Sequence, residues 1–211
     1  MLQLFVLTLK LRLYCSHGQR IISQSSMQKP RYALVAYLKN PAGEFVENLR
    51  RELHPDLPHL CAHLSILPPR PLQGSESSAL QVLDRICGGE EPFEVTLGDV
   101  RSFIPVTPTV YIRVDAAAAR MSALHSKLNT EALAFQEEWP YTPHLTIVKM
   151  SAEPLAQTAF QLAQERWCHF SGSRRILLEK LTFVREEVRQ DAPNCWVDLA
   201  PVLLGRSLVS R

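Results

Sequence analysis

The sequence lacks several patterns that would assign a chain to a class at once. It has five cysteines in 211 residues, an odd number, and contains no CxxC pair. A disulfide framework or a zinc ribbon is therefore not expected, and we interpret the cysteines as reduced thiols of a cytoplasmic protein. GxGxxG, P-loop and GxSxG motifs are also missing. Their absence argues against a dinucleotide-binding domain, a phosphate-binding loop and a serine hydrolase.

Neither charge nor hydrophobicity is concentrated enough to dominate the chain. The formal net charge of +2 is too small to mark a nucleic-acid coat, although it leaves open a local basic groove. Apolar residues make up 46% and charged residues 21% of the sequence, as in ordinary globular proteins. No uninterrupted apolar run is long enough to cross a bilayer, so we expect no membrane partner.

The first residues are apolar but do not follow the order of a signal peptide. In the stretch MLQLFVLTLKLRLYC, Lys10 and Arg12 come after the apolar run rather than before it. A polar segment then leads to Met27. We therefore expect residues 1–28 to be a poorly ordered N-terminal extension and residues 29–205 to form a single domain.

Strand-like and helix-like segments alternate along this domain and suggest an internal repeat. The order strand, helix, strand, helix, strand occurs twice and is followed by one more strand. The segments are 31–38, 41–53, 61–67, 75–89 and 93–103, then 109–115, 116–135, 144–149, 151–167 and 174–186, and finally 194–200. Ser75 and Ser151 are expected to cap helices, and Pro68 and Pro69 to end a strand.

The tetrapeptide His-Leu-Ser/Thr-Ile occurs once in each half. The two copies begin at His63 and His144, so equivalent positions lie 81 residues apart. The same offset relates Leu97 to Leu178 in a later strand. A register that holds across two separate segments predicts two equivalent lobes.

Each motif is expected to place an imidazole and a hydroxyl on one face of a strand. His63 and Ser65 are two residues apart, as are His144 and Thr146, and strand side chains alternate between faces. The leucines and isoleucines between them would face the core. If the lobes pack about a pseudo-two-fold axis, two imidazoles and two hydroxyls meet across a groove.

These groups suit the chemistry of a phosphodiester. A neutral imidazole can take a proton from water or from a ribose hydroxyl, and a protonated imidazole can give one to the departing oxygen. The unperturbed pKa of histidine, ~6.5, allows both forms near neutral pH. Hydroxyls can donate hydrogen bonds to the non-bridging phosphate oxygens, where charge accumulates.

Other candidate sites have less support. The third His-x-Ser sequence, at 169–171, has no counterpart in the first half and is interpreted as accidental. His54 and His59 lie in a proline-broken loop and, with His63, lack convincing metal-ligand spacing, so we predict no metal site. The acidic pair at 137–138 is expected to be solvated.

The paired motifs resemble the signature of the 2H phosphoesterase superfamily, a pair of HxT/S sequences. The flanks HLSILPPRPL and PHLTIVK are similar to its 2′-5′ RNA ligase / RNA 2′,3′-cyclic phosphodiesterase branch. The resemblance covers about residues 30–200. It implies an α+β fold, bilobal through a pseudo-two-fold duplication, with two antiparallel sheets around a central groove and helices on the outside.

The resemblance also implies roles for single residues and metal-independent chemistry. It assigns His63 as the proton donor and His144 as the proton acceptor, with Ser65 and Thr146 binding the phosphate. Ser65 departs from the commoner threonine but keeps the hydroxyl. Lys149 stands where the family often has a basic residue and is expected either to help hold the phosphate or to lie at the surface without a role.

The expected function is hydrolysis of 2′,3′-cyclic phosphates of RNA or nucleotides to 2′-phosphates. We expect a monomer that needs no metal or cofactor, and whose partner is an RNA end or a small nucleotide carrying a cyclic phosphate. Two alternatives stay open: cleavage or ligation of 2′-5′ linkages, and nucleotide binding without turnover. Tyr141 and Arg70 are expected either to line the groove or to lie at the surface without a role.

Overall fold

The structure, a computed structural model, describes residues 29–54, 60–187 and 195–205. The expected N-terminal extension, 1–28, lies outside the described residues. The strands are β1 Arg31–Tyr37, β2 His63–Arg70, β3 Phe93–Ser102, β4 Thr109–Val114, β5 His144–Lys149, β6 Arg175–Leu178, β7 Lys180–Glu187 and β8 Cys195–Leu203. The helices are α1 Pro41–Leu53, α2 Glu76–Gly88, α3 Ala118–Leu128 and α4 Glu153–Cys168, with a 3-10 turn at Glu131–Leu133.

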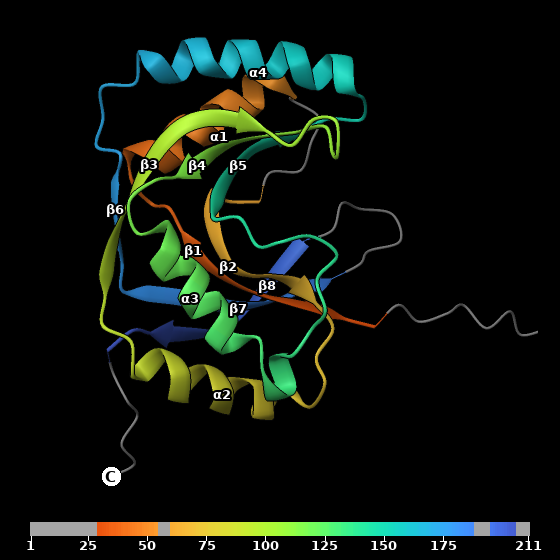
Figure 1. The fold of residues 1–211 in the computed structure, drawn as a ribbon, viewed down its shortest axis with the longest axis vertical. Helices are drawn as coiled ribbons and strands as arrows, with labels where there is room; N and C mark the ends of the chain where they lie inside the picture. The colour runs from red at the N-terminus through yellow and green to blue at the C-terminus, as the bar shows by residue number, and fades with distance from the viewer. Residues whose placement is uncertain (1–28, 55–59, 188–194, 206–211) are drawn as a thin grey trace, which may run out of the picture.

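All the described strands belong to one antiparallel sheet, which confirms the α+β class. The order is β6-β3-β4-β5-β2-β1-β7-β8 (Figure 1). The prediction of two separate sheets is corrected by this order, because the two motif strands β2 and β5 pair with each other. Their pairing is confined to one position, Leu64 opposite Leu145. The sheet therefore has two halves joined at a narrow seam between the motif strands.

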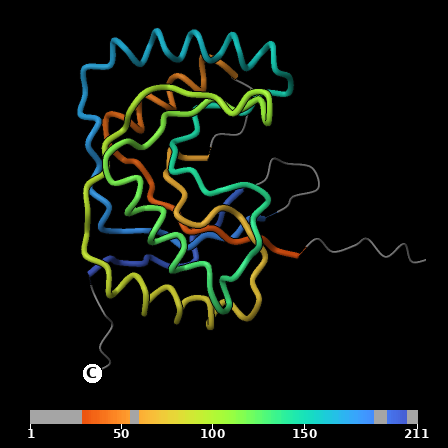
Figure 2. Tube along the Cα trace, viewed as in Figure 1, coloured from red at the N-terminus to blue at the C-terminus, as the bar shows by residue number. Residues whose placement is uncertain are grey.

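The sheet is strongly bent, as the path of residues 175–187 requires. One strand was expected there, but Glu179 separates β6, which pairs with β3, from β7, which pairs with β1. These two strands lie in different halves of the sheet although one residue separates them in the chain. Figure 2 shows this segment running from the upper half to the lower half at the left of the view.

Two helices pack on each half of the sheet. Helices α1 and α4 contact the half that contains β3, β4 and β5, whereas α2 and α3 contact β8 and β2 of the other half. Figure 1 places α4 at one end of the molecule and α2 at the other, with the sheet between them. In the described part of the chain, no helix is long and apolar enough to span a membrane.

The ends of several elements differ from those expected. Ser75 caps α2 as predicted, with its side chain accepting from the Ser78 amide, but α4 begins after Ala152 without a side-chain cap. The strand expected to stop at Pro68 continues to Arg70. Past the seam β2 no longer pairs with β5, so a missing proline N–H removes no ladder bond on that side.

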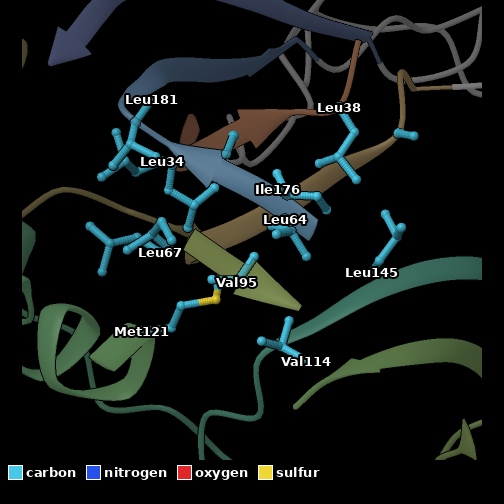
Figure 3. Close-up of a cluster of buried hydrophobic side chains, with 14 of the residues drawn as sticks. Leu34, Leu38, Leu64, Leu67, Val95, Val114, Met121, Leu145, Ile176 and Leu181 are labelled. Atoms are coloured by element: carbon cyan, nitrogen blue, oxygen red, sulfur yellow. The ribbon is translucent and has the colours of Figure 1, made fainter. Parts of the chain in front are cut away.

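One hydrophobic core serves both halves of the sheet. Leu34 and Leu64 from one half join Val114 and Leu145 from the other in a contiguous buried cluster (Figure 3). Leu64 and Leu145, which meet at the seam, are both 0% exposed. The two halves of the sheet therefore share one core, and the bilobal duplication stays a prediction.

The strand order has a symmetry that the sequence repeat anticipates. Reading outward from the seam, β2-β1-β7 in one half matches β5-β4-β3 in the other. Val100 on β3 and Leu181 on β7, 81 residues apart, occupy strands at equivalent places in this order. The order alone does not establish an internal duplication, which stays a prediction.

Candidate active site at the seam between two strands

His63 and His144 are the first residues of β2 and β5, on either side of the seam. The antiparallel pair Leu64–Leu145 lies between them. Continuing this register by one residue sets His63 beside Thr146 and Ser65 beside His144. The two imidazoles are close enough for His144 to affect the pKa of His63. The structure therefore brings both motifs to one place.

Burial follows the alternation expected for these strands. Both motifs show the same pattern, with histidine and hydroxyl residues partly exposed and the leucine and isoleucine buried. The apolar faces belong to the shared core. The polar groups of both motifs thus lie together on the opposite face of the sheet.

A main-chain carbonyl holds each imidazole in the same way. Nδ1 of His63 lies 2.7 Å from the Cys61 carbonyl, and Nδ1 of His144 lies 2.6 Å from the Thr142 carbonyl. A carbonyl only accepts, so Nδ1 of each ring must carry the hydrogen. In the neutral ring, Nε2 is then the basic nitrogen and is the one available to a substrate.

Aromatic rings flank both histidines. The His63 ring lies 4.7 Å from Trp196 and 6.5 Å from Tyr37, measured between ring centroids. The His144 ring lies 5.1 Å from Phe103 and 5.1 Å from Tyr111. No sequence motif indicated these four aromatic residues, because they reach the site from β1, β4, β8 and the end of β3 through strand pairing.

Burial favours the neutral form of both imidazoles. It lowers the pKa of His63 to about 4. The hydrogen bond to the Cys61 carbonyl opposes this shift, and Arg50 and His144 add to it. Burial also lowers the pKa of His144. Before substrate binds, both rings can therefore accept a proton, whereas the donor role that the family implies for His63 requires a protonated ring. An anionic phosphate beside the ring would raise its pKa and supply that condition.

Arg113 is a cation that the sequence did not single out. It lies opposite His144 in the pairing of β4 with β5, and directly opposed residues share a face of a sheet. Its side chain is 45% exposed and forms an ion pair with Asp115 at 2.7 Å. Lys149 is exposed at the far end of β5, about 16 Å along the strand from His144 at ~3.3 Å per residue. Arg113 thus lies nearer to His144 than Lys149 does.

The expectations for Arg70 and Glu137 are corrected. Arg70 is 1% exposed and forms a buried ion pair with Glu137, so it lines no groove and Glu137 is not fully solvated. The Tyr141 hydroxyl donates to the Ser65 carbonyl at 2.7 Å. Tyr141 thus contacts a motif strand, whereas Arg70 bonds to Glu137 and Asn129.

Of the alternative histidines, His169 lies at the end of α4 and not on a motif strand. His169 ends α4 with Nδ1 bonded to the Glu165 carbonyl, and the 169–171 triplet is not part of a strand. Among the described residues, no group of three or more His, Cys, Asp or Glu could hold a metal ion. His59, the middle member of the alternative metal set, lies outside that part of the chain. The four cysteines that the structure describes are free thiols.

Curated relatives are named as phosphoesterases. A candidate phosphoesterase of Halalkalibacterium halodurans is 24% identical over 149 residues, which cover 70% of this chain and 86% of the relative. A candidate phosphoesterase of Oceanobacillus iheyensis is 32% identical over 73 residues, which cover 35% of this chain and 42% of the relative.

Solved structures share the fold at low identity. A protein of Thermus thermophilus superposes with a TM-score of 0.58 at 16% identity, covering 83% of this chain and 98% of its own. LigT of Escherichia coli, complexed with NADP+, gives a TM-score of 0.56 at 14% identity, covering 85% of this chain and all of its own. At such identity the likeness establishes the fold alone.

The family is established by the sequence match. A model of the 2′-5′ RNA ligase superfamily matches residues 38–189, well over half of the chain and both motifs. The family and the names of the relatives indicate a phosphoesterase. The resemblance expected from the paired motifs is confirmed: the chain belongs to the 2′-5′ RNA ligase superfamily, among the 2H phosphoesterases.

Proposed function

We propose that the protein hydrolyses 2′,3′-cyclic phosphates of RNA or nucleotides to 2′-phosphates, with His63 and His144 transferring the protons. The observation that carries this proposal is the matched setting of the two imidazoles. Each ring starts a motif strand, is held at Nδ1 by a carbonyl, and keeps Nε2 for the substrate. A single phosphate bound between the two rings could exchange protons with both of them.

The proposed reaction is one in-line displacement at phosphorus. Nε2 of His144 accepts a proton from water, and the water oxygen forms a new bond to phosphorus. The bond between phosphorus and O3′ breaks, and His63 donates its proton to O3′, which leaves the phosphate on O2′. The unoccupied His63 ring is neutral, because its pKa is about 4. It takes the proton from solvent when the bound phosphate anion raises that pKa. General acid and base catalysis of this kind contributes ~10²–10⁴-fold each.

Hydroxyls and a nearby cation support the charged phosphate. Ser65 and Thr146 lie on the same face as the histidines and are partly exposed, so their hydroxyls can donate to non-bridging oxygens. Arg113, opposite His144, adds positive potential at the edge of the site. Lys149 would act only on a substrate that extends along β5.

A nucleotide fits the surroundings of the histidines. Aromatic rings beside both imidazoles offer surfaces on which a base can stack. Escherichia coli LigT, which shares the fold, has been solved with 3′-AMP and with NADP+. These observations support a nucleotide or an RNA end as the partner of this chain.

The test uses EDTA-treated protein and a panel of nucleoside 2′,3′-cyclic phosphates and 2′-5′ dinucleotides, with 2′- and 3′-phosphate products resolved by chromatography. We expect 2′-phosphates from the cyclic substrates, and we expect His63→Ala and His144→Ala each to lower kcat/KM by ~10²-fold or more. His169→Ala is the matched control, because that exposed histidine also begins a His-x-Ser sequence.

Other outcomes separate the alternatives. Turnover of the 2′-5′ dinucleotides alone would replace the cyclic substrate with a 2′-5′ linkage. Nucleotide binding that survives in both histidine variants, with no turnover by the wild type, would identify a binding module. A 3′-phosphate product would contradict the proposed direction of ring opening.

A further inference from the structure

Each motif strand contains a bulge at the same place. The pairing of β2 with β1 passes over Ile66, and the pairing of β5 with β4 passes over Ile147. These residues are 81 positions apart and directly follow the motif hydroxyls Ser65 and Thr146. A bulge leaves one residue without a ladder partner and turns its peptide groups away from the regular pattern.

The main-chain carbonyls around these bulges lie where β2 and β5 form no ladder of hydrogen bonds with each other. In the described part of the chain, β2 and β5 pair at Leu64–Leu145 alone. Buried main-chain oxygens beyond that point must find other donors, because an unmade hydrogen bond is costly in the interior. Side chains from outside the two strands supply them.

Arg50 supplies the donors on the β5 side. This α1 residue is 8% exposed. Its guanidinium donates to the carbonyls of Thr146 at 2.5 Å and Ile147 at 2.9 Å. A third bond, at 2.6 Å, reaches the carbonyl of Leu60, three residues before His63. One side chain thus joins the part of β5 that carries the motif hydroxyl to the segment that leads into β2. We call this the Arg50 clamp.

Tyr141 and His125 supply the donors at the equivalent carbonyls of β2. The Tyr141 hydroxyl donates to Ser65 at 2.7 Å, and Nδ1 of His125 donates to Ile66 at 2.8 Å. The two rings stack with centroids 4.0 Å apart and planes 2° from parallel. Since Tyr141 lies three residues before His144, this Tyr141 clamp ties the entry of one motif strand to the middle of the other.

A buried network fixes the Tyr141 clamp from behind. Nε2 of His125, which is 6% exposed, lies 3.4 Å from a Glu137 carboxylate oxygen. Glu137 pairs with Arg70, which also donates to Asn129 at 3.1 Å. The clamp is therefore built into the core rather than resting on the surface.

We infer that the Arg50 clamp and the Tyr141 clamp are positioning devices that hold the two motif strands in register at the seam. Their donors take the place of the missing ladder at the carbonyls of Ser65, Ile66, Thr146 and Ile147. The clamps fix each hydroxyl and each Nε2 with respect to the other motif. Neither clamp touches the reacting atoms in this arrangement, and the consequence for turnover rests on the proposed function.

Conservative substitutions can remove the hydrogen bonds of the clamps while keeping the ring or the charge of each side chain in place. Tyr141→Phe keeps the stacked ring and deletes only the hydroxyl, while Arg50→Lys keeps the charge but cannot make the same three bonds. Tyr32→Phe is the matched control, because Tyr32 is 7% exposed and its hydroxyl donates to Glu76, away from the seam. We expect the first two variants to lower kcat about 10–100-fold with KM changed less than about twofold, since misplacing reacting groups by an ångström is costly.

The imidazoles themselves provide a readout that needs no substrate. In nitrogen-15 NMR spectra, we expect the ring signals of His63 and His144 to move in Tyr141→Phe and Arg50→Lys and to stay in place in Tyr32→Phe. Ring signals of Tyr141→Phe that coincide with those of the wild type would overturn the inference. If the wild type turns over no phosphodiester, the proposed function fails while the NMR comparison still decides whether the clamps position the histidines.

Discussion

Single residues at the seam combine two demands that oppose each other. His63 and His144 start strands whose apolar faces form the core, yet both side chains stay partly exposed. Their Nδ1 bonds to carbonyls let both rings be buried on one side without an unsatisfied hydrogen. The same burial reduces the proton affinity of both rings, since it lowers the pKa of each. In the proposed reaction, a bound phosphate anion would raise the pKa of the ring that donates the proton.

Protein stability should fall in mild acid because of His63. Its folded pKa is about 4, against ~6.5 in the unfolded chain. Between these values the unfolded state binds the proton more readily, so this histidine's contribution is complete above pH ~6.5 and is lost as the pH falls toward 4. One such proton corresponds to a slope of ~1.4 kcal/mol per pH unit.

Urea unfolding of wild type and His63→Gln at several pH values measures this slope. We expect the variant to lose less stability between pH 6.5 and 4.5, while carboxylates affect both proteins alike. Curves that run parallel over this interval would show that the folded ring titrates normally. His169→Gln, at an exposed position, is the control.

At the scale of elements, β8 completes the site. It pairs with β7 at the edge of the sheet and brings Trp196 to within 4.7 Å of the His63 ring. Part of the environment of His63 on β2 therefore comes from a strand that begins more than 130 residues later in the sequence. Strand pairing, rather than any local pattern, decides which side chains surround the histidine.

Removing Trp196 should raise the pKa of His63. Burial is the main cause of its lowered value, and Trp196→Ala admits water beside the ring, which favours the charged form. Titration of the His63 ring by NMR measures the change. Trp139→Ala is the control, since Trp139 is already 57% exposed. An unchanged pKa in Trp196→Ala would assign the burial to other neighbours.

At the scale of the whole molecule, the shared core makes the two halves depend on each other. Leu64 and Leu145 meet at the seam and are both fully buried. The segment through Glu179 also links the two halves directly. We therefore propose that residues 29–205 fold as one domain, with neither half stable by itself.

Leu64→Ala should destabilise both halves together. A buried leucine truncated to alanine typically costs ~2–5 kcal/mol, and the cavity would open where the halves join. Hydrogen exchange followed by mass spectrometry should show equal loss of protection in peptides from β1 and from β4. Leu155→Ala, at a position 52% exposed, should leave both unchanged. Loss of protection confined to the β1 half would mean that the halves unfold separately.

Local pattern predicted some elements well and others poorly. Helix α1 spans 41–53 as expected, because Phe45, Leu49 and Leu53 recur at helical spacing. The 174–186 segment was expected to be one strand, since no turn residue marks Glu179 as a break. The division into β6 and β7 follows from the bend of the sheet, and a single sequence carries little signal for such long-range pairing.

The sequence by itself determined which chemical groups the two motifs contain and which of them share a face of a strand. The alternation of strand side chains places His63 with Ser65 and His144 with Thr146, and this depends only on neighbours in the chain. Only the tertiary structure decided that β2 and β5 pair, that Trp196 covers His63, and that Arg113 lies beside His144. Those contacts join segments far apart in sequence, and the pKa of each imidazole depends on them because burial comes from packing. The family could be recognised from two tetrapeptides, whereas their environment required the fold.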